Sequence, residues 1–564
     1  MGLSDDASLS PALQALPNEL LGSICSLLCN RDVKSLRLTC RALRDKSYLR
    51  FDRIFISANP CNVDVLLAVA NHDIFRHRVK EIIWDDTLLR EIPSTDGHGS
   101  CGYSEDESDS DVSDEDESDS DPYPENEDKD QIPRAFVRLC KDSIFLTEGR
   151  LVDRDKYQSD NEAYIGTLSE VQNQHDNPMS TRDSLAYYTE LLCQQKEVLS
   201  SSADEEAFRY AIQRFPQLTK ITITPAAHGF LFMPLYQTPM IRAFPSGFVY
   251  PIPRTWPRDD ILRGSPEDCP EGWGNDDERK QWRGFCMVSK ALDDYADKLQ
   301  IAELVVDGHK LPTGIDYTLF DKPNTEYDSL CKIVARPGFK RLVLSLTTGY
   351  RVNFPGSEDL GIYKNGRISN LLAKATDLEE VTLQINDEVS SWCCDMEDFI
   401  SLYDLFPVDI SFTGKLRHFG LSGLSVKQDD LISFLGRLPS TLKSVELSFL
   451  ALVRGHGTHA TMLAEIRDKL DWRHRPVSQR VKVSISMMLN VRCEGRYVCL
   501  DKEVQEYIYG DGPMPFIASE RWEVAYFTWG TGIFYDEFDS GFAVPYENNK
   551  VRCERQLLSG STSV

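Results

Sequence analysis

One stretch of the chain has residue types and a spacing that could serve in hydrolysis. Residues 455–460 read GHGTHA, so His456 and His459 stand among glycine and threonine. A serine hydrolase needs a histidine base, a carboxylate that orients it and a serine nucleophile in a strained turn. No segment after His459 has the composition of such a turn, and the helix-forming stretch TMLAEIRDKL follows directly. We therefore predict a loop that enters a helix, with no catalytic role.

The sequence contains no complete motif for protease, metal or nucleotide chemistry. GHGTHA resembles the histidine motif of subtilisin-like proteases, but the supporting parts are missing from the sequence. Cys25 and Cys29 lie one helical turn apart among leucines, and no histidine completes a tetrahedral zinc set. The cysteines at 393–394 and at 493 and 499 lack ligand spacing, and no glycine-rich phosphate loop is present. The sequence predicts a protein that is not an enzyme and has no metal and no cofactor.

Phosphorylation is the one modification that the sequence suggests. Four serines each have an acidic residue three positions further on, namely Ser104, Ser108, Ser113 and Ser118. This spacing resembles the site preference of casein kinase 2. The surrounding run 104–130 holds 15 acidic residues against Lys129 alone, and it carries about half of the formal charge of −27. It has almost no apolar side chains to offset the entropy of ordering it, so we predict a disordered acidic loop over 93–134.

Three roles for the acidic loop stay open. It could be a solvated insertion without a role, a bait for a basic substrate or basic tail, or an intramolecular mask over a basic surface. Deletion of residues 104–130, followed by comparison of the partners recovered, separates these roles.

The charge and the cysteines limit the classes of partner. The chain has 62 Lys+Arg against 89 Asp+Glu, whereas binding to a phosphate backbone needs clustered positive charge, so we expect no nucleic-acid partner. No apolar run approaches the roughly 20 residues that cross a bilayer, so we expect no membrane contact. The 15 cysteines include no CxxC pair, and no apolar segment follows the start MGLSDDASLS. These features predict a cytoplasmic or nuclear location.

A short sequence pattern, apolar-x-x-apolar-x-apolar, recurs along the chain and indicates strands. On a strand the last two apolar positions face the same way, while the first anchors the bend before it. The pattern occurs eight times, with a weaker ninth case, at 51–56, 79–84, 218–223, 301–306, 339–344, 378–383, 416–421, 442–447 and 478–483. We predict a strand in each of these segments.

Helical patterns lie between these predicted strands. Residues 367–375 and 426–438 place leucines and other apolar residues at helical spacing. From residue 301 the strand patterns begin 38, 39 and 38 residues apart, before a shorter step of 26. Such an alternation resembles an irregular leucine-rich repeat with insertions, which implies a curved solenoid with parallel strands. The predicted fold class is α/β, with a non-repeating α/β domain as the alternative because residue identities do not repeat.

A proline- and aromatic-rich insertion interrupts the strand patterns. Residues 233–257 contain six prolines after Met233 together with Phe, Tyr and Trp, and we expect neither a regular helix nor a central strand there. Packing over the repeat core is the favoured role, and a ligand platform is the alternative. This insertion and the segment 468–485 (DKLDWRHRPVSQRVKVSI) are similar to parts of large fungal F-box proteins.

Residues 16–44, LPNELLGSICSLLCNRDVKSLRLTCRALR, carry the strongest family signal. They resemble the F-box, a short helical module that docks onto the Skp1 adaptor of cullin-based ubiquitin ligases. Apolar residues recur at helical spacing in two or three expected helices, and Asp32 is placed to cap the second. An ordinary helical hairpin is the alternative. The resemblance implies a docking set of Leu16, Pro17, Glu19, Leu20, Leu21, Ile24, Leu28, Val33, Leu36, Leu38 and Leu43.

The resemblance also implies a function. An F-box before a repeat arc implies a non-catalytic substrate receptor, which binds a Skp1-like adaptor and through it a cullin, and which presents a protein substrate of unknown identity. A basic protein is one class of substrate that the acidic loop suits. Two alternatives stay open: an adaptor-bound scaffold without ubiquitination, and an acidic binder of basic proteins.

Six segments follow from these interpretations. A flexible N-terminus (1–10) and the F-box (11–50) precede the first repeat-like units (51–92) and the acidic loop (93–134). The irregular leucine-rich-repeat-like domain with its insertion then spans 135–510, and a C-terminal extension spans 511–564.

Overall fold

A parallel sheet forms the centre of the molecule. The computed structural model describes residues 16–28, 30–49, 51–92, 132–156, 162–254, 256, 273–274, 276–347, 361–386, 400–407, 414–488, 494–517 and 531–546. The strands lie side by side in sequence order, as β1 Arg53–Ile56, β2 Glu81–Asp85, β3 Lys220–Thr224, β4 Glu303–Val306, β6 Arg341–Thr347, β7 Glu380–Asn386, β8 His418–Ser422, β10 Ser444–Ser448 and β12 Lys482–Ser484. Every pairing along this path is parallel, and β5 Ile315–Asp316 adds to β6.

The nine predicted strands are therefore confirmed, and so is the α/β class. In each strand the two apolar positions of the pattern are buried, as in Ile221 and Ile223 of β3. The anchor position that precedes them is buried in seven of the nine segments, for example Leu378 before β7, whereas Phe51 is half-buried and Ser478 is exposed. Side chains alternate along a strand, so the residues between these positions point to the opposite face of the sheet.

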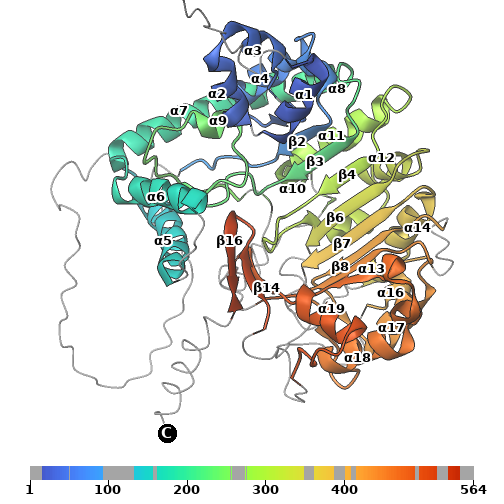
Figure 1. Ribbon diagram of the computed structural model, residues 1–564. Helices are drawn as coiled ribbons and strands as arrows, with labels where there is room; N and C mark the ends of the chain where they lie inside the picture. The colour runs from blue at the N-terminus through green and yellow to red at the C-terminus, as the bar shows by residue number, and fades with distance from the viewer. Residues whose placement is uncertain are drawn as a thin grey trace, which may run out of the picture.

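Helices cover one face of the sheet (Figure 1). Most neighbouring helices of this layer pack against each other, in the same order as the strands. The layer contains α4 Pro60–Ala70, α8 Ala203–Ile212, α11 Arg283–Asp294, α12 Thr325–Val334, α14 Arg367–Lys374, α16 Leu402–Leu405, α17 Gln428–Arg437, α18 His459–Lys469 and α19 Asp501–Tyr509. The helices predicted at 367–375 and 426–438 are α14 and α17. The opposite face of the sheet is called the inner face below.

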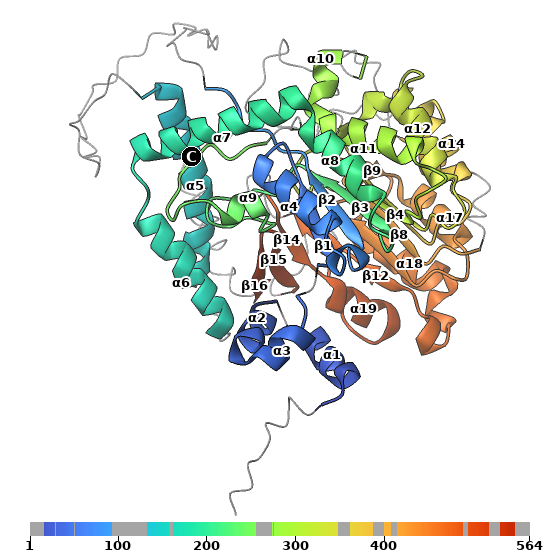
Figure 2. The same ribbon diagram turned by 90° about the horizontal axis from the view of Figure 1, so that it is seen from above.

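Three long helices and the shorter α8 lie where the sequence indicated only an acidic loop and a gap. They are α5 Arg134–Lys156, α6 Glu162–Asp176, α7 Thr181–Ser201 and α8. Figure 2 shows α5 and α6 standing away from the helical layer, with α7 leading back to α8. Most of the predicted acidic loop, residues 93–131 with the four candidate phosphorylation sites, lies outside the described residues.

A small antiparallel sheet on the inner side was also not predicted. Its strands are β13 Ser486–Met488, β14 Arg496–Cys499, β15 Ile533–Asp536 and β16 Asp539–Pro545. Because β14 pairs with β15, this sheet joins residues on both sides of the boundary predicted at residue 510. Two further short strands, β9 Ser425–Val426 and β11 Ala451–Leu452, pair with each other.

The proline-rich insertion packs mainly against α5 and α7, whereas packing over the repeat core was predicted. It contains one short helix, α9 Pro239–Arg242, which Pro239 begins after the Thr238 cap, so the expectation of no helix was wrong for four residues. Phe248 and Tyr250 join a cluster with α5 and α7 that is separate from the main core. The insertion therefore fastens the unpredicted helices to the sheet.

The remaining described elements are short. Three helices precede the sheet, as α1 Asn18–Leu27, α2 Asn30–Thr39 and α3 Arg41–Lys46, and α10 Asp276–Arg279 and α13 Gly361–Lys364 lie beside the helical layer. Among the described helices, we find none that is long and apolar enough to cross a membrane.

Candidate functional site

The three N-terminal helices build a module with a core of its own. Leu21, Cys25 and Leu43 are buried together, and Leu36 and Cys40 pack against them. Val33 is also fully buried. The helix boundaries differ in detail from the prediction: Pro17 occupies the N-cap of α1, and α2 begins at Asn30, so Asp32 lies in the first turn and does not cap it. Leu43 lies on a separate third helix, because the backbone at Cys40 is extended and ends the preceding helix.

An apolar row on the outside of this module is open to solvent. The exposed fractions are 53% for Leu20, 38% for Ile24 and 86% each for Leu27 and Leu38. Leu20, Ile24 and Leu27 follow helical spacing along α1, so they form one stripe. Burying such side chains against a partner is favourable by about 1.5–3 kcal/mol each. The row is therefore a candidate docking surface.

The predicted docking set divides into exposed and buried members. Pro17 and Glu19 are exposed beside the row, and Leu16, Leu28 and Leu36 are half-buried. Leu21, Val33 and Leu43 hold the helices together, so they support the surface without forming it. Leu27 was left out of the predicted set, although its position three residues after Ile24 places it on the same stripe.

A short, packed connection joins the module to the sheet. Six residues separate the end of α3 at Lys46 from the start of β1 at Arg53. The Arg37 guanidinium donates to the carbonyl of Ser47, the Arg78 guanidinium lies 5.1 Å from the ring centroid of Tyr48, and Phe51 packs on Phe75 with ring centroids 4.4 Å apart. Of these contacts, the one between Arg78 and Tyr48 links the connection to the sheet domain, while the other two hold the ends of the connection.

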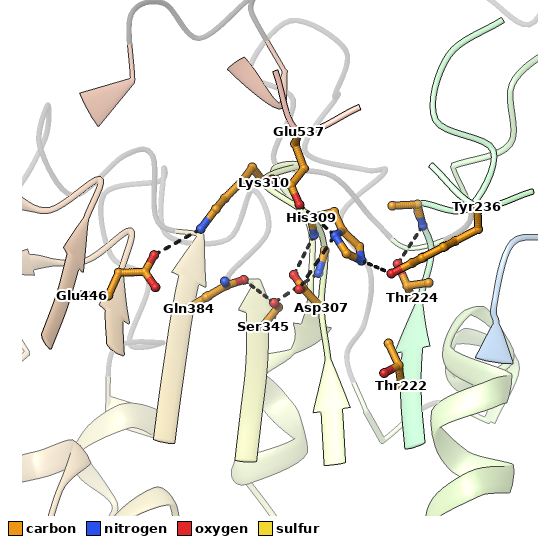
Figure 3. Close-up of polar contacts among 12 residues, drawn as sticks. Thr222, Thr224, Tyr236, Asp307, His309, Lys310, Ser345, Gln384, Glu446 and Glu537 are labelled. Atoms are coloured by element: carbon orange, nitrogen blue, oxygen red, sulfur yellow. Dashed lines mark hydrogen bonds and ion pairs between the residues drawn. The ribbon is translucent and has the colours of Figure 1, made fainter. Parts of the chain in front are cut away.

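A second candidate site is a polar cluster on the inner face, at the carboxyl ends of the parallel strands (Figure 3). The loop after β4 carries Asp307, His309 and Lys310. His309 Nδ1 lies 3.0 Å from Glu537 Oε1, and its Nε2 lies 3.1 Å from the hydroxyl of Tyr236. His309 thus connects the β4 loop with the insertion and with the turn between β15 and β16.

The charge on His309 is favoured by its neighbours. Burial disfavours the imidazolium, but the carboxylates of Asp307 and Glu537 outweigh burial and raise the pKa of His309. In the charged form both ring nitrogens donate, one to Glu537 and one to Tyr236. Lys310 extends the network, because its Nζ lies 3.4 Å from Glu446 Oε1 on β10.

Small polar side chains form the floor of this cluster. Ser345 Oγ donates to Gln384 Oε1 at 2.6 Å and accepts from the backbone N–H of Gly308 at 3.3 Å. Ser448 donates to Glu446 at 3.0 Å. The strand pattern could not predict this cluster. Its strand members, such as Ser345, Gln384 and Glu446, alternate with the apolar residues of the pattern, and its other members lie in loops.

An ion-pair network anchors the C-terminal turn nearby. Asp536 is buried and accepts from both Arg150 of α5 and Arg496 of β14. The Arg150 guanidinium also lies 3.6 Å from the ring centroid of Phe230, three residues before the insertion, and Phe230 packs in one cluster with Met233 of the insertion. The small sheet, the insertion and α5 are therefore held together beside the polar cluster.

A small polar cavity lies behind β2. Its volume of about 10 Å³ is enough for one water molecule. Asp85, His228, Gln195 and Thr87 are among the lining residues, and His228 Nδ1 lies 2.9 Å from the hydroxyl of Tyr250. Burial raises the pKa of Asp85 to about 7 and lowers that of His228 to about 3. Both groups are neutral between these values, so their contact at 4.0 Å is not an ion pair.

His459, the second histidine of GHGTHA, has a structural role. Thr458 caps α18 and His459 begins it, as the predicted loop into a helix requires. His459 Nε2 lies 2.9 Å from the carbonyl oxygen of Leu450, and burial lowers the pKa of His459 to about 4. Within the described ranges, no group of three or more His, Cys, Asp or Glu side chains could hold a metal ion.

No protein-family model matches the chain, and no curated protein sequence matches it either.

Proposed function

We propose that this protein is the substrate-recognition subunit of a Skp1-cullin-F-box ubiquitin ligase. Its N-terminal module would dock on a Skp1-like adaptor, and the sheet domain would hold a protein substrate. The observation that carries the proposal is the exposed apolar row of Leu20, Ile24 and Leu27 on α1, together with the exposed Leu38 on α2, in a module whose sequence resembles the F-box.

The arrangement of the sheet supports the second half of the proposal. Parallel strands in sequence order, each followed by a covering helix, are the arrangement of a solenoid of the leucine-rich-repeat kind. We infer that the domain is an irregular member of that class, with the insertion and the helices α5 to α7 added between β2 and β4. Its inner face is the surface on which such solenoids bind partners.

The proposed mechanism is catalysis by proximity. A receptor that holds a substrate lysine near a ubiquitin thioester raises their effective concentration without supplying a nucleophile. A fixed connection between module and sheet then matters, because misplacement by a few ångströms lowers that concentration. The six-residue length of the connection and the contact of Tyr48 with Arg78 support such a fixed geometry.

Docking is tested with purified adaptor and the double variant Leu20→Asp/Ile24→Asp. A carboxylate buried in an apolar interface without a partner costs several kcal/mol, so we expect affinity to fall at least about a hundredfold. Val477→Asp/Ile517→Asp is the matched control, because these apolar residues are also exposed, at 77% and 45%, but lie outside the module.

The result is decided by the comparison between the two variants. Equal adaptor affinity for wild type and Leu20→Asp/Ile24→Asp, measured by titration calorimetry, would remove the docking proposal. Adaptor binding without cullin in the purified complex would instead favour the scaffold alternative over a ubiquitin ligase.

A further inference from the structure

Three residues with a left-handed backbone meet at one place on the inner face. The φ angles are 53° for His309, 61° for Lys310 and 55° for Phe449. Lys310 Nζ lies 5.3 Å from the ring centroid of Phe449 and 3.4 Å from Glu446. Bulky residues rarely adopt this conformation, and such strain is concentrated at sites where other residues must be held in place. The strained backbone therefore marks the junction between β10 and the small sheet as a candidate functional site.

Two tyrosines extend the aromatic surface from Phe449 across the small sheet. Tyr497 of β14 lies directly opposite Tyr535 of β15. Their ring centroids are 5.8 Å apart, and that of Phe449 lies 6.0 Å from Tyr497. All three side chains are half-buried. Among the described residues we find no hydrogen bond to either tyrosine hydroxyl, so both hydroxyls are free for a partner.

The tyrosines lie on the less buried face of the small sheet. Along β15 the residues alternate between half-buried and buried, and Phe534 and Asp536 are on the buried side. The same alternation in β14 places Arg496 and Val498 on the buried side. Removing the tyrosine rings therefore changes the surface and leaves the packed side of the sheet intact.

Carboxylates flank the aromatic row. The side chains of Glu446 and Glu537 are 28% and 26% exposed. Burial is the main cause that raises the pKa of the Tyr497 hydroxyl, and the negative charges of Glu537 and Glu446 add to it, which places both carboxylates near that ring. Each carboxylate has one internal cation, Lys310 or His309, and keeps further acceptor sites, because a carboxylate offers about four.

We propose that this aromatic–acidic surface, formed by Glu446, Phe449, Tyr497, Tyr535 and Glu537, binds a basic segment of a partner protein through arginine side chains. A guanidinium stacks on aromatic faces and pairs with carboxylates in one geometry, which an ammonium does less well. Lys310 already shows the arrangement inside the chain, with its amine between the Phe449 ring and Glu446. The net charge of −27 would steer a basic segment toward the molecule. Taking this partner to be the ligase substrate rests on the proposed function.

The test measures binding of a fluorescein-labelled octa-arginine peptide by anisotropy. The acidic run 104–130 also attracts polycations, so the parent protein is the full chain with the acidic residues of that run changed to Asn and Gln. We expect this parent to bind octa-arginine several-fold more tightly than octa-lysine. Tyr497→Ala/Tyr535→Ala should weaken binding at least about tenfold, whereas Tyr497→Phe/Tyr535→Phe should keep most of it because the rings remain.

Matched controls separate surface binding from altered folding. Tyr210→Ala/Tyr295→Ala removes two half-buried tyrosines on the helical layer and should leave the affinity unchanged. Equal affinity of the parent and Tyr497→Ala/Tyr535→Ala would overturn the proposal, and so would absence of binding by the parent at about 1 mM peptide. Leu20→Asp/Ile24→Asp should lose the adaptor and keep the peptide, so failure of the adaptor proposal is distinguishable from failure of this one.

Discussion

At the scale of single residues, the cavity behind β2 shows how burial decides protonation. Thr87 donates to Asp85 Oδ1 from its backbone N–H at 3.2 Å and from its hydroxyl at 2.6 Å. These bonds favour the carboxylate, yet burial dominates and raises the pKa to about 7. The second oxygen faces the cavity and His228. An amide in place of the carboxyl would keep both bonds from Thr87 through its oxygen.

We therefore expect Asp85→Asn to change how stability depends on pH. The pKa of this carboxyl rises from an ordinary 3.8 to about 7 on folding, so wild type loses stability as pH rises from about 4 to about 7, because only the unfolded chain ionises freely. The variant lacks this loss, and above pH 7 it should be more stable by an amount on the order of a few kcal/mol. Urea unfolding at several pH values measures the difference, with the exposed Asp64→Asn as control. A constant difference between variant and wild type from pH 4 to 8 would contradict this account.

At the scale of elements, the sequence predicted the strands of the parallel sheet better than the helices and the small sheet that pack beside them. The pattern that ends in Val381 and Leu383 is local, so each strand can be read from six residues. The helices α5 to α7 have no such stripe toward the sheet, because they pack on the insertion through residues such as Phe136 and Tyr188. Pairing of β14 with β15 joins segments more than thirty residues apart in the chain, and no local pattern indicates it.

One close contact between elements gives a sharp prediction. Gly284 of α11 lies against Trp84 of β2, and a Cβ there would lie 2.2 Å from Trp84 Nε1. Gly284→Ala must therefore push the helix away from the sheet, and we expect a loss of about 1–3 kcal/mol in the free energy of unfolding. Gly436→Ala on α17 is the matched control, because its Cβ would meet only Leu470 at 3.6 Å. Helix propensity makes that control neutral or more stable by up to about 1 kcal/mol. Equal unfolding midpoints in urea for the two variants would show that the contact is not tight.

At the scale of the whole molecule, the two candidate surfaces differ in how far sequence could locate them. The apolar row lies on helices that are continuous in sequence, so spacing alone places Leu20, Ile24 and Leu27 together. The inner-face cluster brings Tyr236, His309 and Glu537 together from segments up to 301 residues apart. Only the folded arrangement of the insertion, the β4 loop and the C-terminal turn creates it.

The division into module and sheet predicts two levels of local stability. The module has helices of 10, 10 and 6 residues around the four buried side chains of Leu21, Cys25, Val33 and Leu43, and isolated helices shorter than about 12–15 residues are marginal in water. In the free chain we expect the amides of α1 to exchange with solvent at least about a hundredfold faster than those of β6, which lies between two strands in the main core. Binding of the adaptor would cover the apolar row, so it should slow exchange in α1 and leave β6 unchanged. Hydrogen exchange read by mass spectrometry measures both segments in one sample. Protection of α1 equal to that of β6 in the free chain would mean that the module is stable alone and needs no partner surface to complete its core.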